Sequence, residues 1–348
     1  MKSLLDSTAV SAPDPAIAPD APAAATAPER QLAAVAGLCK ASADPLRLQI
    51  LRVLRSDSFG VSELCSIFGV RQPALSHHLK VLAGAGLVAT RREGNSIFYR
   101  RSELGQRREL APLQRRLFAT VDRIELPREI RHRLGTLHRQ RERNSASFFR
   151  DNAHKFRQQQ DLIASYGQYA DTVAQVLRDA PLRHHATALE VGPGDGAFLR
   201  ELGPRFRRVV ALDNAQAMLE QARARAEAEG LANVEFILGD TRSPALEGLA
   251  ADCAVINMVL HHTPSPGEVL KDVARCLAPG GTILVTDLCS HDQAWARENC
   301  GDLWLGFGPE QLTAWAGEAG LREIASEYLA QRNGFQVQVR LFGRPDPT

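Results

Sequence analysis

The stretch Glu190-Val191-Gly192-Pro193-Gly194-Asp195-Gly196 joins the end of a short apolar run to a turn that contains three glycines. Glycines in such a turn let a ligand approach the backbone closely, and the following residues open a helix. The spacing is GxGxG rather than the GxGxxG of pyrophosphate-binding folds, and the turn holds no Lys or Arg to meet a phosphate. It therefore favours a nucleoside without phosphates, although glycines at this spacing also form ordinary tight turns.

Alternating helices and short apolar strands surround this turn. The order predicts an α/β domain with a mostly parallel sheet, which we place at 161–348. A mainly helical, arginine-rich connector at 124–160 precedes it. The expected strands span 186–191, 207–212, 233–237, 252–257, 281–287, 322–329 and 335–343. The expected helices span 196–203, 215–229, 266–278 and 309–319.

Polar residues follow three further strands of this expected sheet. Asp213 ends the second strand, 21 positions after Gly192, where an acidic residue accepts hydrogen bonds from ribose hydroxyls in Rossmann-like sites. Asp240 follows the third strand, where a carboxylate can accept a hydrogen bond from an adenine amino group, and Asn257 follows the fourth. Since ligands bind at the carboxyl ends of strands in open α/β sheets, we expect these groups to surround one ligand.

The first half of the chain carries a different pattern of short helices. Apolar residues recur at helical spacing after Asp44-Pro45, a helix start signal with Pro in the first turn. Gly69 separates the second helix from the third, and a Gly-containing turn between two short helices is typical of a helix-turn-helix. The three helices are expected at 46–54, 61–68 and 72–82.

The third helix is expected to read DNA. Leu75, Leu79 and Leu82 share its inward face. Side chains on the opposite face are placed to reach base edges or phosphates in a major groove, and they are Gln72, Ser76, His77 and Lys80.

The segment 86–100 gives two strand-like runs around the turn Glu93-Gly94-Asn95, which predicts a wing. Three arginines of the wing, Arg91, Arg92 and Arg100, are available for DNA phosphates.

Charge and composition separate the two halves. Residues 28–160 hold 25 Lys/Arg and 12 Asp/Glu, a net charge of +13, whereas 161–348 hold 16 and 25, a net charge of −9. A basic half beside an acidic half suggests that the first half meets a polyanion, although a solvated basic face has the same composition.

Further features of the composition bear on location. The Ala/Pro/Asp-rich segment 1–27 cannot bury a core, so we expect a disordered tail there. No apolar run approaches the roughly 18 residues of a membrane span, so we expect no membrane contact. The six cysteines show no paired spacing, which favours reduced thiols and a cytoplasmic location.

Four short motifs mark the basic half: Ala43-Asp44-Pro45-Leu46-Arg47, Ser76-His77-His78-Leu79-Lys80-Val81-Leu82, Ala85-Gly86-Leu87-Val88 and Arg92-Glu93-Gly94. Together they resemble the ArsR-type bacterial repressors over about 28–123. The resemblance implies a winged helix-turn-helix domain, mainly α, that forms a homodimer on a two-fold operator in double-stranded DNA. Flanking helices at about 30–42 and 103–123 would form the dimer interface.

The sequence departs from metal-sensing ArsR members, which carry two cysteines on the second helix. Here the second helix carries Cys65, and Ile67 occupies the position of the other cysteine. A lone Cys is more often a small buried hydrophobic residue than a metal ligand. His132 and His138 in the connector are expected to be surface residues rather than a zinc pair. We therefore expect no metal.

The motifs of the second half, with Leu277-Ala278-Pro279-Gly280-Gly281-Thr282 further on, resemble class I S-adenosylmethionine-dependent methyltransferases over about 184–343. The resemblance implies a Rossmann-like fold that binds S-adenosylmethionine or S-adenosylhomocysteine. For Met218, a core position is at least as consistent with the sequence as a contact with the cofactor. For Tyr166, a buried structural role and a role in covering the cofactor are equally consistent with it. The implied contacts are Glu190, Gly192, Gly194, Gly196, Asp213, Asn214, Met218, Asp240, Thr241 and Asn257.

The whole arrangement resembles ArsR-type regulators fused to a methyltransferase-like domain, some of which sense S-adenosylmethionine or S-adenosylhomocysteine. We expect a transcriptional regulator, a repressor by that resemblance, with the connector coupling ligand to DNA. One alternative is an active methyltransferase that modifies a small-molecule acceptor, and another is a dimerisation module with an empty pocket. Methyl transfer requires mainly positioning, so no catalytic base is required. Packing roles are the favoured interpretation of His261, His262 and His291.

Overall fold

The computed structural model describes residues 26–345, except 56, 94–95, 103–108, 153–155 and 294. Side chains are likewise not described at 92–93, 96, 145–146, 149, 151–152, 156–157, 159 and 297–299. Most of the expected tail, the turn residues Gly94 and Asn95, and the start of the expected helix 103–123 lie outside the described residues. None of the helices in the described part has the length and apolar character needed to cross a bilayer.

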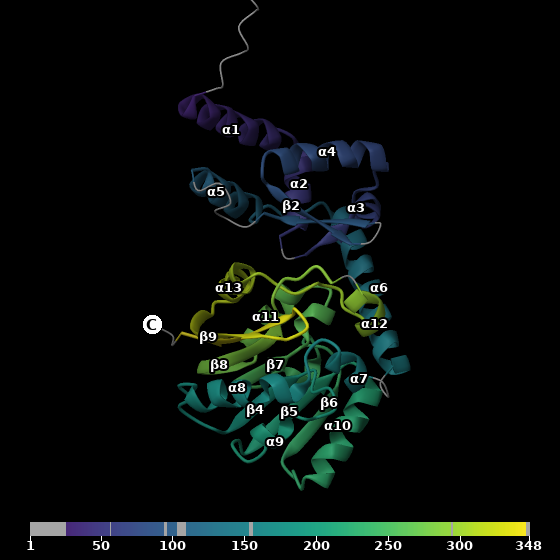
Figure 1. The fold of residues 1–348 in the computed structure, drawn as a ribbon, viewed down its shortest axis with the longest axis vertical. Coiled ribbons are helices and arrows are strands. Elements are labelled where there is room, and N and C mark those ends of the chain that lie inside the picture. The colour runs from purple at the N-terminus through teal and green to yellow at the C-terminus, as the bar shows by residue number, and fades with distance from the viewer. Residues whose placement is uncertain are drawn as a thin grey trace, which may run out of the picture.

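The N-terminal domain is a bundle of short helices with a small sheet in the order β1-β3-β2 (Figure 1). Asp44 caps α2 by accepting a hydrogen bond from the Arg47 amide at 3.0 Å, and Pro45 occupies the first turn. The elements are α1 (Ala27–Ser42), α2 (Pro45–Val53), β1 (Phe59–Gly60), α3 (Val61–Phe68), α4 (Gln72–Gly84), β2 (Val88–Glu93), β3 (Ser96–Arg101) and α5 (Ala111–Val121).

The predicted helix-turn-helix is confirmed. Gly69 ends α3 in the left-handed conformation, with φ of 67°, and α4 begins three residues later. Leu75, Leu79 and Leu82 are all fully buried, as the helical spacing predicted. The strand β1 was not predicted, because two residues carry too little periodicity to mark a strand.

The C-terminal domain has a seven-stranded sheet in the order β6-β5-β4-β7-β8-β10-β9. Strands β4 to β8 are mutually parallel, and β10 runs antiparallel to both β8 and β9. This confirms the mostly parallel, Rossmann-like sheet. The strands are β4 (Thr187–Val191), β5 (Arg208–Asp213), β6 (Val234–Leu238), β7 (Ala251–Asn257), β8 (Leu277–Leu288), β9 (Arg322–Ala330) and β10 (Gln336–Gly343).

Helices cover both faces of this sheet and bury a separate apolar cluster on each. The α-helices are α8 (Tyr166–Asp179), α9 (Leu199–Leu202), α10 (Gln216–Ala228), α11 (Pro266–Arg275), α12 (Trp295–Cys300) and α13 (Pro309–Glu318), with the 3-10 turns η2 (Pro244–Leu246) and η3 (Leu260–His262). Strand β8 begins four residues earlier than expected, because Leu277 already pairs with Ala251.

The connector contains the long helix α6 (Arg128–Asn152) and the short helix α7 (Phe156–Asp161). Figure 1 shows α6 running from the N-terminal domain down one side of the C-terminal domain. It contacts α3 in the first domain and α10 in the second. One helix therefore packs against both halves of the protein.

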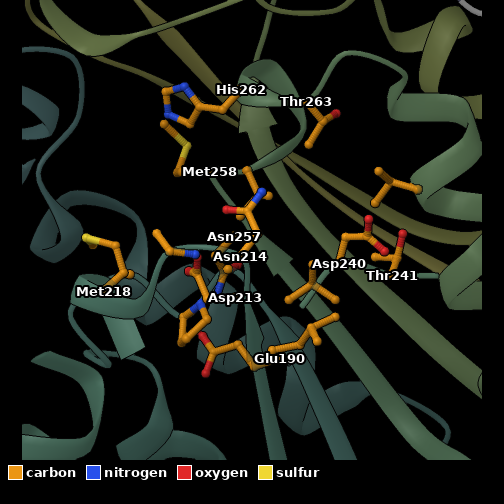
Figure 2. A pocket seen from close by; sticks show the side chains of 18 of the residues that line it. Glu190, Asp213, Asn214, Met218, Asp240, Thr241, Asn257, Met258, His262 and Thr263 are labelled. Carbon is orange, nitrogen blue, oxygen red and sulfur yellow. The ribbon is translucent and has the colours of Figure 1, made fainter. Parts of the chain in front are cut away.

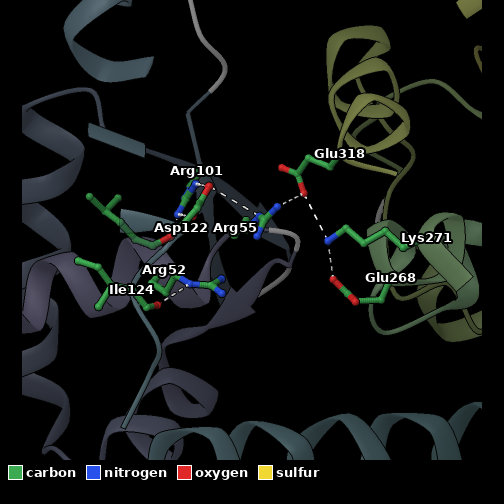
Figure 3. Close-up of polar contacts among 9 residues, drawn as sticks. Arg52, Arg55, Arg101, Asp122, Ile124, Glu268, Lys271 and Glu318 are labelled. Atoms are coloured by element: carbon green, nitrogen blue, oxygen red, sulfur yellow. Dashed lines mark hydrogen bonds and ion pairs between the residues drawn. The ribbon is translucent and has the colours of Figure 1, made fainter. Parts of the chain in front are cut away.

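Ion pairs add a direct contact between the two domains (Figure 3). Arg55, just after α2, lies 2.7 Å from Glu318 of α13 and 3.6 Å from Asp122 in its own domain. Lys271 of α11 lies 3.5 Å from the same Glu318 and 2.7 Å from Glu268. Arg101 forms a two-pronged pair with Asp122, at 3.0 and 2.5 Å. The contact is thus a chain of alternating charges.

Candidate functional site

A cavity of about 750 Å³ opens at the carboxyl edge of β4, β5, β6 and β7. That volume lies within the roughly 300–1,000 Å³ typical of small-molecule sites. Figure 2 shows Glu190, Asp213, Asp240 and Asn257 arranged around it. All ten predicted cofactor-binding residues except Gly196 line the cavity, so the structure brings the predicted set together.

The glycine turn has the backbone that its sequence requires. Gly192, Gly194 and Gly196 have φ of 65°, 59° and 78°, a region that other residues rarely adopt. A Cβ on Gly192 would lie 2.6 Å from Cγ2 of Val259, and one on Gly196 would lie 2.9 Å from the Cα of Ala222. Gly196 therefore contributes by letting α10 pack closely, whereas Gly192 and Gly194 face the cavity.

Glu190 is a buried carboxyl at the base of the cavity. Its residue is only 1% exposed, and among the described residues its Oε2 has no hydrogen-bond partner. Burial, helped by the nearby charge of Asp195, raises the pKa of Glu190 to about 8. A cationic or hydrogen-bond-donating ligand group would satisfy this oxygen.

Asp213 ends β5 on the opposite side of the glycine turn. Burial raises its pKa to about 6, although the backbone amides of Ala215 and Asn214 stabilise the carboxylate. The Ala215 amide donates to Oδ1 at 2.8 Å and fixes the carboxyl group. Such a fixed acceptor suits the hydroxyls of a ribose.

Asn257, at the end of β7, is a second buried polar group without a partner. Neither Oδ1 nor Nδ2 of its amide has a hydrogen-bond partner among the described residues. The next residue, Met258, has φ of 56°, which is rare for a residue other than glycine. The hydroxyl of Tyr166 in the cavity wall is also buried, and the guanidinium of Arg200 lies over the Tyr166 ring. Buried polar groups need partners, so this cavity is built for a polar ligand.

Asp240 and Thr241 form the wall after β6. Partial burial opposes ionisation of Asp240, but hydrogen bonds and charge from Arg242 outweigh it and lower the pKa. Thr241 donates its hydroxyl hydrogen to Oδ2 of Asp272 at 2.9 Å, so its orientation is fixed by α11. Met218 is 2% exposed and belongs to a small cluster with Ala215, apart from the two main cores. It both packs and lines the cavity.

Four side chains of α6 also line the cavity: His138, Glu142, Arg143 and Arg150. Sequence reasoning missed them, because nothing in a basic amphipathic helix specifies which distant cavity it will cover. It did predict that the connector couples the two domains.

The predicted DNA-reading residues lie on α4, which Figure 1 shows on the side of the N-terminal domain away from the C-terminal domain. Gln72, His77 and Lys80 are exposed, and Ser76 is half-buried. No DNA is present, so their contacts with bases stay predictions.

The wing arginines have a different environment. Burial and the charge of His261 lower the pKa of His291, a residue of the C-terminal domain, to about 4, and the charge of Arg91 adds a smaller effect. Arg100 is half-buried, and the side chain of Arg92 lies outside the described residues. Their predicted phosphate contacts remain untested.

The three candidate bases differ in access. His262 lines the cavity, and burial together with the charge of His261 lowers its pKa well below the usual value. His261 is 1% exposed, and its Nδ1 lies 2.7 Å from Oδ1 of Asp287. Nε2 of His291 is buried, without a partner among the described residues. A neutral His262 is thus the histidine that a bound ligand can meet.

Two family descriptions match this chain. Residues 44–90 match "Bacterial regulatory protein, arsR family", and residues 189–285 match "Methyltransferase domain". The first range covers the helix-turn-helix and the start of the wing. The second begins within β4 and ends within β8, so it contains the glycine turn and all the predicted cofactor-binding positions.

Curated relatives match the chain in part. A biofilm growth-associated repressor of Agrobacterium fabrum is 46% identical over 75 residues, 22% of this chain and 64% of the repressor. A malonyl-[acyl-carrier protein] O-methyltransferase of Serratia marcescens is 30% identical over 159 residues, 45% of this chain and 58% of the enzyme.

A 37.1 kDa protein in transposon TN4556 of Streptomyces fradiae is 36% identical over 134 residues, 36% of this chain and 38% of that protein. The chain thus spans between 38% and 64% of the length of these relatives. The chain therefore carries one segment that matches the bacterial arsR regulatory family and a second segment that matches the methyltransferase domain.

Proposed function

We propose that the protein is a transcriptional regulator whose affinity for operator DNA changes when S-adenosylmethionine or S-adenosylhomocysteine occupies the cavity. One observation carries this proposal. Helix α6 lines the cavity and also holds α3 of the helix-turn-helix through Arg141 and Glu63. A ligand can change DNA binding only if its affinity differs between two conformations, and α6 is an element that both surfaces contact.

The donor and acceptor groups of the cavity favour an adenosyl amino acid as the ligand. Glu190 suits an ammonium group, Asp213 suits ribose hydroxyls, and Asp240 suits an adenine amino group. Arg143 and Arg150 in the cavity wall can meet a carboxylate. The glycine turn itself holds no cation for a phosphate.

A chain of contacts supports the coupling. Arg141 donates from Nε and Nη2 to the Glu63 carboxylate, at 3.0 and 2.7 Å, and from Nη2 to the Ser58 carbonyl at 3.0 Å. The next residue, Glu142, accepts from Arg242 at 2.9 Å, and the same Arg242 nitrogen lies 2.9 Å from Asp240. A ligand donor that binds Asp240 therefore competes with Arg242 for this carboxylate and changes the hold of Arg242 on α6.

A second contact joins the domains beside the cavity. Asp57, a buried residue of the N-terminal domain, lies 3.4 Å from Nε2 of His138 on α6. It also accepts a hydrogen bond from the Ser265 hydroxyl at 3.0 Å. His138 and Ser265 both line the cavity, so ligand contact with either one reaches the N-terminal domain directly.

The N-terminal domain also has surfaces that suit a DNA-bound homodimer. Leu32 and Val35 on α1 and Leu113 on α5 are 71%, 40% and 41% exposed. Apolar residues on these two helices would be covered by a second copy, the partner that the ArsR resemblance implies. A symmetric dimer would present two copies of α4 to successive major grooves.

The test is operator binding with and without ligand. The full-length protein selects its operator from random DNA, and affinity is then measured while each adenosyl ligand is titrated. We expect a ligand-dependent change in wild type and none in Asp213→Ala at the same ligand concentrations. Glu235→Gln, on the exposed side of β6, is the matched control and should respond like wild type. An equal response in Asp213→Ala, or none in wild type, contradicts the proposal.

A second candidate is a small-molecule methyltransferase that carries its own DNA-binding domain. It is favoured by the neutral His262 in the cavity wall and by the likeness of 159 residues to an O-methyltransferase. Methyl transfer is an in-line displacement in which positioning dominates, and a neutral imidazole beside the ligand could accept the proton of an acceptor hydroxyl. Formation of S-adenosylhomocysteine with a cellular small-molecule fraction, lost in Asp213→Ala, would support it.

A further inference from the structure

Next to the cavity, behind Met258, lies a buried cluster of two histidines and a carboxylate. His261 and His262 end the turn η3 after β7, and Asp302 comes from the segment between α12 and α13. Their residues are 1%, 8% and 2% exposed. Within the residues that the structure describes, this is the one group of three or more His, Cys, Asp or Glu side chains with ligand atoms all within 4.8 Å of one another.

The distances within the cluster suit a metal ion. Oδ1 of Asp302 lies 3.8 Å from Nε2 of His261 and 3.6 Å from Nδ1 of His262. The same Nδ1 lies 3.3 Å from the Gly301 carbonyl oxygen, a hydrogen bond that metal binding through this atom would replace. Ligand atoms at the corners of a tetrahedral zinc site lie roughly 3.3–3.5 Å apart, given metal–ligand bonds of about 2.0–2.1 Å. Small side-chain rotations would therefore close the three atoms around one ion.

Asp287 orients the first histidine. The Nδ1–H of His261 donates to Oδ1 of Asp287 at 2.7 Å, and that oxygen also accepts from the Leu288 amide at 2.7 Å. Because Nδ1 carries the shared proton, the lone pair of a neutral His261 is on Nε2, which faces Asp302. Metal-binding imidazoles commonly donate a hydrogen bond from the other ring nitrogen to a carboxylate, which orients the ring.

A small void lies between the three side chains. It measures about 10 Å³, and His261, His262 and Asp302 line it together with Met258 and Cys300. This volume is about that of one small probe sphere, so the space suits a single ion or water rather than an organic ligand. The three side chains therefore border a space of that size, with Gln160 and Ile163 completing its wall.

We propose that His261, His262 and Asp302 bind one divalent transition-metal ion of the Zn²⁺ class, with Asp287 as the positioning residue for His261. Two imidazoles and a carboxylate are the ligands that such ions prefer. This site is separate from Cys65 and Ile67, the positions at which metal-sensing ArsR members carry cysteines.

The metal would fix one wall of the cavity. The segment that carries Asp302 is already joined to η3, because the amides of Leu303 and Trp304 donate to the His261 carbonyl at 2.8 and 3.0 Å. An ion between Asp302 and the two histidines would lock the same two segments through their side chains. His262 would then be held in the cavity wall by a metal bond.

The rival explanation needs no metal. A protonated His261 between Asp287 and Asp302 would hold the same groups together as an ion pair, and its raised pKa, about 9, is consistent with that arrangement. The two explanations differ in one measurable respect: the ion-pair cluster keeps no metal.

The experiment uses the full chain, stripped with a chelator, exposed to Zn²⁺ alone and freed of excess metal by gel filtration. We expect wild type to retain about one equivalent per chain and to gain thermal stability from Zn²⁺, because the ion binds the folded state. Asp302→Asn and His262→Gln should lose both effects. His132→Gln, at an exposed position of α6, should keep them.

Circular dichroism checks the folding of each variant. If Asp302→Asn does not fold, His262→Gln decides the question, because that side chain lies at the cavity wall. Retention of no zinc by wild type overturns the proposal in favour of the ion pair. Undiminished zinc in both variants overturns it as well, since the metal would then be bound elsewhere.

Discussion

At the scale of single residues, Glu190 combines deep burial with a carboxyl oxygen that lacks a partner. Because its pKa lies near 8, most of this group is protonated at neutral pH, and a cationic ligand must displace that proton. We predict that affinity for S-adenosylhomocysteine rises with pH and levels off above about 8. The slope approaches one proton released per ligand bound.

Calorimetry in two buffers with different ionisation enthalpies measures that proton release. Glu190→Gln has the same shape and no titrating group, so it should bind more weakly and lose most of the pH dependence between 6 and 8. Asp213, with a pKa of about 6, accounts for what remains at lower pH. An unchanged slope in Glu190→Gln would show that the released proton comes from another group.

Gly196 gives a second prediction at this scale. A methyl group there meets the backbone of α10 at 2.9 Å, and φ is 78°. Gly196→Ala should therefore destabilise the C-terminal domain by about 1–3 kcal/mol from backbone strain, plus the cost of moving α10. Gly230→Ala is the control, because its φ is 72° but a Cβ there meets open space. If urea denaturation shows equal losses of unfolding free energy for Gly196→Ala and Gly230→Ala, the close approach of α10 has no part in the effect.

At the scale of elements, α6 is expected to carry the coupling. Glu142→Gln removes the charge that holds Arg242 to α6 and leaves the cavity its shape. We predict that the variant still binds S-adenosylhomocysteine with affinity within a few-fold of wild type, while its DNA affinity responds less to that ligand. Operator binding at zero and saturating ligand measures the difference.

Glu129→Gln is the matched control for that experiment, since Glu129 is an exposed residue in the first turn of the same helix. It should leave the response unchanged. A full response in Glu142→Gln would remove the Arg242 link from the coupling and leave the contact of Asp57 with His138 and Ser265 as the route.

Element positions were largely predictable because each depends on local pattern. The helix 61–68 was predicted at the bounds it has, and the strands of the large sheet were found because apolar runs ended at polar or glycine residues. The glycine turn identified the cavity for the same reason. Local signals of this kind predict the structure because they depend only on residues that are close in the sequence.

What the sequence did not predict depends on contacts between distant segments. Asp302 lies 40 positions after His262, and no spacing rule brings it to the two histidines. The side chains of α6 that line the cavity likewise follow from packing rather than from periodicity. From local patterns alone, packing roles are therefore the favoured interpretation of His261 and His262, and no metal is expected.

At the scale of the whole molecule, the charge chain through Glu318 holds the two domains in the arrangement described. Its members are about a quarter exposed, so each pair contributes no more than about 1 kcal/mol and is weakened by salt. We predict that Glu318→Gln increases hydrogen exchange at the C-terminal end of α2 by a few-fold, because Arg55 is released from α13. Glu310→Gln, in the first turn of α13, should leave exchange unchanged.

Mass spectrometry of the exchanged peptides at low and high ionic strength checks this. Wild type at high salt should approach the variant, since salt screens the same pairs. Identical exchange in wild type and Glu318→Gln at low salt would mean that the α6 contacts and the hydrogen bond from Ser265 to Asp57 suffice to hold the domains.

If α6 couples the cavity to the helix-turn-helix as proposed, the influence between them runs in both directions. By linkage, operator binding would change the affinity for the small molecule by a certain factor. The small molecule would change the affinity for the operator by that same factor. At a given concentration of the adenosyl compound, the fraction of occupied sites would therefore differ between promoter-bound protein and free protein. The promoter itself would then act as an effector, and the ligand concentration at half response would depend on how many promoters the protein serves.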